Sequence, residues 1–65
     1  MYSFIEIVGK DSISWEFAAI NAIDMASESL RDIRIAEVKE LDVKIDNGKI
    51  SEYRARINLS FRDEK

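Results

Sequence analysis

The dipeptide Asn47-Gly48 constrains the folding of this 65-residue chain more than any other feature. The preferred two-residue hairpin turn needs positive φ angles at both central positions, and Asn-Gly adopts them at little cost. The segments on either side, Ile33 to Asp46 and Lys49 to Arg62, are rich in the β-branched and aromatic residues typical of strands. We therefore predict two long antiparallel strands joined by this turn.

The turn also predicts the register of the hairpin, because it fixes which residues face each other. The facing pairs are Asp46 with Lys49, Ile45 with Ile50, Leu41 with Arg54, Val38 with Ile57, and Ile35 with Ser60. One face of the hairpin is then continuously apolar and suited to receive a helix. Its residues are Ala36, Val38, Tyr53, Ala55, Ile57, Leu59 and Phe61.

The opposite face of the hairpin holds five aliphatic residues among charged ones, namely Ile35, Leu41, Val43, Ile45 and Ile50. Since one helix covers only one face, this second apolar patch indicates an interface with another molecule. The alternative is a β-bulge near Lys39-Glu40, which would turn Leu41, Val43 and Ile45 back toward the helix. We favour the interface, because the unbulged register already pairs Val38 with Ile57.

The segment from Ser12 to Leu30 has the spacing of an amphipathic helix. At 100° per residue its buried stripe consists of Trp15, Ala18, Ala19, Ala22, Ile23, Ala26 and Leu30. We expect Ser14 to cap the helix through its side-chain oxygen, so that Trp15 and Glu16 are its first residues. The helix is expected to end between Leu30 and Asp32.

A first strand completes the predicted β-α-β-β order. The run from Tyr2 to Val8 predicts a first strand that stops at Gly9, with apolar residues on both of its faces. Phe17 and Ile20 lie on the helix outside its buried stripe, so we expect them to contact another copy of the chain.

Composition limits how such a chain can be stabilised. A domain of 65 residues without cysteine or histidine has neither a disulfide nor a Cys/His zinc site to support its small core. We therefore expect a single domain over residues 1–65 that is stabilised by oligomerisation. The net charge of −3 argues against general nucleic-acid binding. No apolar run approaches membrane-spanning length and no signal-peptide pattern is present, so the expected location is the cytoplasm.

The residue types also argue against an enzyme. Without His or Cys, the familiar nucleophile-base systems are excluded. The hairpin carries four carboxylates, Glu37, Glu40, Asp42 and Asp46. No metal site is expected, because these carboxylates lack the spacing of a Ca²⁺ loop and alternate with lysines. Arg54 and Arg56 form a basic spot that could meet an anion, although cross-strand pairing with acidic neighbours is the commoner use. Trp15 could stack on a ligand, but its place on the alanine stripe favours the core.

Taken in order, several short motifs resemble the dodecin family from about Phe4 to Arg62. They are Gly9, Ser14-Trp15-Glu16, the alanine-rich helix, Ile33-Arg34, Glu37-Val38, Asn47-Gly48-Lys49-Ile50, Glu52-Tyr53-Arg54 and Ser60-Phe61. The resemblance implies an α+β fold in which a three-stranded antiparallel sheet partly wraps around one helix. It also implies a homododecamer, a hollow shell of twelve copies, and no catalytic activity.

The resemblance further implies a flavin (riboflavin, FMN or FAD) held at interfaces between copies, stored without turnover. The family's flavin-stacking tryptophan corresponds to Ile35, and its hydrogen-bonding glutamine corresponds to Arg54. An isoleucine has no aromatic face, and arginine donates hydrogen bonds but cannot accept one. The alternative is therefore a dodecin-like shell that has lost flavin binding and serves as a structural or small-ligand container, with an anionic ligand reaching Arg54.

Overall fold

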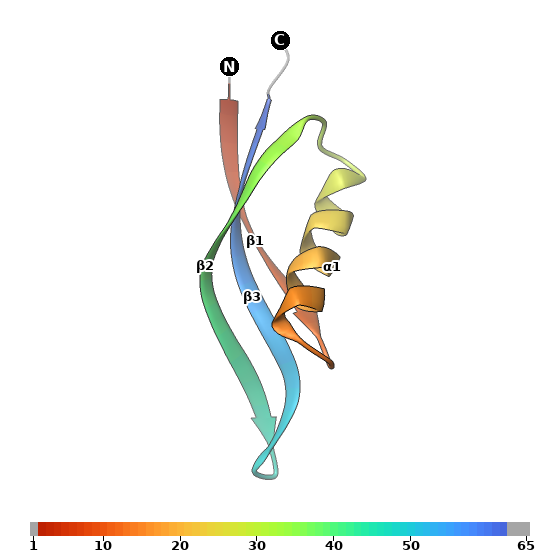
Figure 1. The fold of residues 1–65 in the computed structure, drawn as a ribbon, viewed down its shortest axis with the longest axis vertical. Helices are drawn as coiled ribbons and strands as arrows, with labels where there is room; N and C mark the ends of the chain where they lie inside the picture. Colours follow the sequence, from red (N-terminus) through yellow and green to blue (C-terminus); the bar gives the residue numbers. More distant parts are fainter. Residues whose placement is uncertain (1, 63–65) are drawn as a thin grey trace.

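The computed structural model describes residues 2–62, which form β1 (Tyr2–Asp11), α1 (Trp15–Ser27), β2 (Ile33–Asp46) and β3 (Lys49–Arg62). The three strands form one antiparallel sheet in the order β1-β3-β2. The helix lies against one face of this sheet, and the far end of the β2-β3 hairpin projects beyond it (Figure 1). The predicted β-α-β-β fold and the predicted bounds of both hairpin strands are confirmed.

The first strand is longer than the sequence predicts, because it continues through Gly9 to Asp11. Gly9 pairs with Ala55 inside the ladder and is buried, so it is not a stop signal. A Cβ atom at this position would collide with the backbone oxygen of Ala18 and lie 2.6 Å from the Cβ of Ala22. The glycine is therefore required by the close approach of α1 to β1.

The helix begins as predicted and ends earlier than predicted. The Oγ of Ser14 accepts a hydrogen bond from the backbone N–H of Phe17 at 3.1 Å, as an N-cap does. The helix ends at Ser27 with Glu28 as its C-cap, and the N–H of Leu30 still donates to the carbonyl of Ala26 at 2.9 Å. Asp32 then adopts a positive φ of 53° and redirects the chain into β2. The apolar spacing extends to Leu30 because this residue packs against the core from outside the helix.

The core is a thin layer between the helix and the sheet. Alanines from α1 meet a short apolar row of β3, so the buried residues are Ala18, Ala22, Ala26, Ala55, Ile57 and Leu59. Among these, only Ile57 and Leu59 have large side chains. Many large apolar residues remain exposed in a single copy, including Phe17 (49%) and Ile20 (47%). Such exposure is typical of a chain that buries more surface by association.

Four of the five predicted hairpin pairs are confirmed, and the pairing of Leu41 with Arg54 is wrong. The register shifts between Val38 and Glu40, where Lys39 is an extra residue in β2, and Leu41 therefore faces Ala55. It shifts back between Lys44 and Ile45. The turn fixes the register only as far as the first bulge.

The bulge at Lys39 changes which residues lie on the second hairpin face, the face that we favoured as an interface. Leu41 and Val43 pair with Ala55 and Tyr53, and directly paired residues point to the same side of a sheet. Ala55 belongs to the core beneath the helix. Leu41 and Val43 therefore lie on the helix-facing side, as the alternative near Lys39-Glu40 predicted.

Candidate functional site

The starts of β1 and β2 and the end of β3 lie together at one end of the sheet (Figure 1). On the face that points away from the helix, this end carries a mainly apolar group of side chains. Phe4 of β1 and Ile35 of β2 both pair with Ser60 of β3, so they flank this serine on either side. Since Leu59 is buried beneath the helix and side chains alternate along a strand, Ser60 and its two partners face outward. Phe4 and Ile35 are each 65% exposed.

These residues form an open hollow of about 350 Å³ that is lined by Tyr2, Phe4, Arg34, Ile35 and Ser60. Its walls are mainly apolar, and its polar groups are the hydroxyls of Tyr2 and Ser60 and the guanidinium of Arg34. We call these five residues the outer hollow. Its chemistry suits a planar apolar group with a polar or anionic attachment.

A further bulge, at the start of β2, brings Arg34 to the outer hollow. Ile33 faces Phe61 and Ile35 faces Ser60, so Arg34 is the extra residue of β2 between two consecutive positions of β3. Bulges alter the direction in which a strand presents its side chains. A regular strand would alternate Arg34 and Ile35 between opposite faces, yet both residues line the outer hollow.

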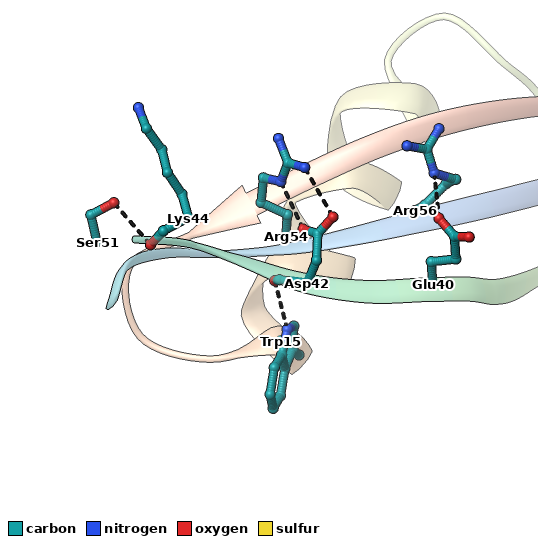
Figure 2. A network of polar contacts seen from close by, with 7 residues as sticks. All are labelled: Trp15, Glu40, Asp42, Lys44, Ser51, Arg54 and Arg56. Atoms are coloured by element: carbon teal, nitrogen blue, oxygen red, sulfur yellow. Dashed lines mark hydrogen bonds and ion pairs between the residues drawn. The ribbon is translucent and has the colours of Figure 1, made fainter. Parts of the chain in front are cut away.

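A polar network lies further along the same sheet (Figure 2). The guanidinium of Arg54 binds the carboxylate of Asp42 in a bidentate pair, with Nε to Oδ1 at 2.7 Å and Nη2 to Oδ2 at 2.9 Å. This hydrogen bonding lowers the pKa of Asp42 and raises that of Arg54. Arg56 forms a second pair with Glu40 at 3.2 Å. The cross-strand use of both arginines is the one we considered commoner.

Trp15 connects the start of the helix to this part of the hairpin. Its indole Nε1 donates to the backbone oxygen of Asp42 at 3.0 Å (Figure 2). Its ring meets that of Tyr53 edge to face, with centroids 5.1 Å apart. The side chain is 39% exposed, so it sits at the margin of the core rather than inside it. It acts as a structural brace between α1 and β2.

The fold and the sequence together agree with one family. The family model of dodecin matches residues 1–64. This chain belongs to the dodecin family. The family is oligomeric and non-catalytic, in agreement with the prediction that the chain is not an enzyme.

Several dodecins are similar to this chain. The calcium dodecin of Mycobacterium tuberculosis is 43% identical over 63 residues, covering 95% of this chain and 87% of that protein. The crystal structure of calcium dodecin from Mycobacterium tuberculosis has a TM-score of 0.89 at 42% identity, covering 98% of this chain and 91% of that one. The structure of dodecin from Streptomyces coelicolor has a TM-score of 0.96 at 29% identity, covering 100% of this chain and 93% of that one.

Dodecins bind flavins, whereas the relative from Mycobacterium tuberculosis is a calcium dodecin. Within residues 2–62, no group of three or more His, Cys, Asp or Glu side chains converges on a point that could hold a metal ion. Asp42 and Glu40 are already paired with arginines. Residues 2–62 of a single copy therefore bring no cluster of metal-ligating side chains together.

Ile35 and Arg54, the two positions expected to contact flavin, do not meet within one copy. Both lie on the outward face, but Ile35 faces Ser60, which is six residues from Arg54 along β3. At about 3.4 Å per residue this corresponds to roughly 20 Å. A dodecin ligand that touches both residues would have to take them from different copies.

Sequence reasoning overlooked Tyr2, Phe4 and Arg34 as site residues. The signal for Phe4 was present, because apolar residues occupy both faces of β1 and only one face packs on the helix. Nothing in the sequence indicates the bulge that brings Arg34 to the outer hollow of this dodecin.

In the part of the chain that the structure describes, no helix has the length and apolarity needed to cross a membrane.

Proposed function

We propose that this dodecin is a non-catalytic protein that binds and stores flavin at interfaces between the copies of a homododecamer, and that it does so in the cytoplasm. The observation that carries the proposal is the pairing of Phe4 and Ile35 with the same residue, Ser60, on the exposed outward face. This arrangement supplies an aromatic and an aliphatic contact for one planar ring.

Phe4 offers the aromatic face that Ile35 lacks. Neighbouring strands are about 4.8 Å apart, so Phe4 on β1 and Ile35 on β2 lie roughly 10 Å from each other across β3. That separation matches the scale of a fused three-ring heterocycle. Offset stacking on a phenyl ring contributes roughly 0.5–1.5 kcal/mol beyond the burial of apolar area. Tyr2 provides a second ring in the same hollow.

The same geometry favours a site between two copies. The outer hollow is open, so a single copy contacts a ring from one side only. A two-fold axis would place the hollows of two copies opposite each other, because such an interface uses the same patch on both subunits. The exposed apolar residues of both copies would then be buried together with the ligand.

Two other ligands have weaker support. An anionic ligand reaching Arg54 would have to displace Asp42 from a bidentate pair. Calcium, suggested by the name of the relative from Mycobacterium tuberculosis, would need carboxylates from more than one copy, because residues 2–62 of one copy provide no cluster.

Titration of FMN with the purified protein tests the proposal. We expect quenching of flavin fluorescence that saturates at a fixed ratio of flavin to subunit. Phe4→Leu keeps an apolar side chain but removes the stacking ring, so it should weaken flavin binding about 2- to 10-fold. Ile13→Ala, in the exposed connection between β1 and α1 and outside the outer hollow, is the control and should leave the affinity unchanged. Fluorescence that the wild-type protein leaves undisturbed would contradict the proposal.

The oligomeric part of the proposal has its own test in Phe17. This side chain is 49% exposed in one copy, on a helix whose other face is already packed. Phe17→Glu would place a charge in the expected interface, so we expect subunits or small oligomers in place of the large assembly. Solution mass by light scattering measures this outcome, with Ser12→Glu in the exposed β1-α1 connection as the control. A Phe17→Glu variant with the mass of the wild-type assembly would exclude this contact.

A further inference from the structure

We infer that the projecting end of the β2-β3 hairpin packs against the outer face of helix α1 of a neighbouring copy, and that the two surfaces match in apolar and in charged residues. We call residues 43–53, at the far end of the hairpin, the arm. The inference rests on the proposed homododecamer and specifies a contact that its two-fold interfaces cannot provide. A two-fold interface joins copies only in pairs, so an assembly of twelve copies needs a second interface.

The helix-facing side of the arm is only partly covered within one copy. Ile45 is two residues beyond Val43 and pairs with Ile50, so both isoleucines lie on the same side of the hairpin as Val43. The arm projects beyond the start of α1 (Figure 1), and both isoleucines are exposed. The apolar surface beneath the helix therefore continues past the helix that covers it, which leaves this part open to a second helix.

The outer face of α1 is apolar near its start and acidic near its end. Phe17 and Ile20 lie outside the buried stripe and are exposed. Asp24 follows on the same face, four residues after Ile20, and Glu28 comes four residues later. Residues 12–30 include no lysine or arginine, so the negative charge of this face is not balanced by the helix itself.

The arm supplies lysines for these carboxylates. Lys44 and Lys49 each adjoin one of the two isoleucines, and both are exposed. They face Glu52 and Asp46 across the hairpin, but the ion pairs within residues 2–62 join only arginines of β3 to carboxylates of β2. The arm is two strands wide, because β1 ends opposite Tyr53. The flexible stem of a lysine can therefore carry its ammonium group around the edge of the arm.

The two surfaces match each other better than they match themselves. Contact between two α1 outer faces would bring the carboxylates of both copies together, which like-charge repulsion disfavours. Contact between an arm and an outer face places apolar residues against apolar residues and lysines near carboxylates. A contact between unlike patches closes into a ring when its rotation permits, so it can join the two-fold pairs into a closed assembly.

Cross-linking between engineered cysteines tests the contact, because the chain has no cysteine of its own. Ile50→Cys and Phe17→Cys proteins are reassembled together from denaturant and treated with a short bifunctional thiol reagent. We expect covalent dimers from the mixture and none from either variant alone, since the contact joins an arm to a helix. Ile50→Cys mixed with Arg31→Cys, in the exposed connection after α1, is the matched control and should give no dimers.

An exchange of charges tests the electrostatic match. Lys44→Glu with Lys49→Glu should lower the solution mass of the assembly, and so should Asp24→Lys with Glu28→Lys, because each pair of changes opposes like charges. All four changes in one chain restore opposite charges and the net charge of −3, so the wild-type mass should return. Light scattering measures the mass, and circular dichroism shows whether each variant keeps its fold.

The possible failures are distinguishable. Cross-links that are missing from the mixture, or that form in Ile50→Cys alone, would overturn the contact between arm and helix. A folded charge variant with the wild-type mass, or a combined variant that does not recover it, would overturn the charge match. In either case a wild-type assembly that quenches flavin fluorescence leaves the proposed function standing. A monomeric wild-type protein would overturn the proposed assembly and this inference together.

Discussion

Gly9→Ala is expected to destabilise this dodecin by roughly 3 kcal/mol or more, or to prevent its folding. Overpacked sites usually cost about 1–3 kcal/mol, and the cost is highest when the obstructing atom cannot move aside. Here the new methyl group would meet the backbone oxygen of Ala18 and the Cβ of Ala22, both fixed in the helix. Relief requires α1 to move away from β1, which would open the thin core.

Denaturant unfolding measures this effect, with wild type and variant compared at one protein concentration because assembly contributes to stability. Glu6→Ala is the matched control, since Glu6 lies on the same strand with its side chain exposed, and a change within about 0.5 kcal/mol is expected. A Gly9→Ala protein as stable as the control would show that the helix does not approach the strand as closely as described.

Ile35→Trp is expected to tighten flavin binding by about 10-fold. A tryptophan at this position would add a second aromatic contact to the one that Phe4 supplies across β3. Stacking contributes roughly 0.5–1.5 kcal/mol per pair, and the upper value corresponds to a factor of about 10. The side chain is 65% exposed, so the larger ring can be accommodated without disturbing the core.

Quenching of FMN fluorescence provides the measurement. Ile13→Trp, in the exposed connection between β1 and α1, is the control for a nonspecific effect of an added indole. An Ile35→Trp variant that assembles normally and binds FMN no better than the wild type would remove Ile35 from the flavin site.

The hairpin shows how far sequence reasoning reaches in this chain. Asn47 and Gly48 have positive φ angles of 52° and 76°, as the turn chemistry requires, and the strand bounds on either side are those predicted. The pairings nearest the turn and those beyond Val38 are confirmed as well. The wrong pairing, Leu41 with Arg54, lies between two register shifts. The aliphatic residues beyond Lys39 indicated a bulge there as the alternative, but the turn chemistry alone favoured the unbulged register.

The helix shows the same division between local and tertiary causes. Its start depends on the Ser14 cap, a local interaction that the sequence makes visible. Its end depends on where the chain must turn into β2, and Leu30 keeps helical spacing while packing from outside the helix. Gly9 was interpreted as a strand stop because the close approach of Ala18 and Ala22 is a tertiary contact.

The candidate site was only partly predictable. The family resemblance pointed to Ile35 and Arg54, and the structure places both on the outward face but far apart within one copy. Phe4 and Arg34 enter the site through strand pairing and a bulge, which only a folded sheet defines. The roles of all four residues in flavin binding remain predictions.

A crystal structure of the assembled protein saturated with FMN tests the central claim most directly. The account predicts isoalloxazine density against Phe4 and Ile35 at an interface between two copies. Density for FMN elsewhere, or an outer hollow that neighbouring copies fill completely with protein side chains, would contradict it.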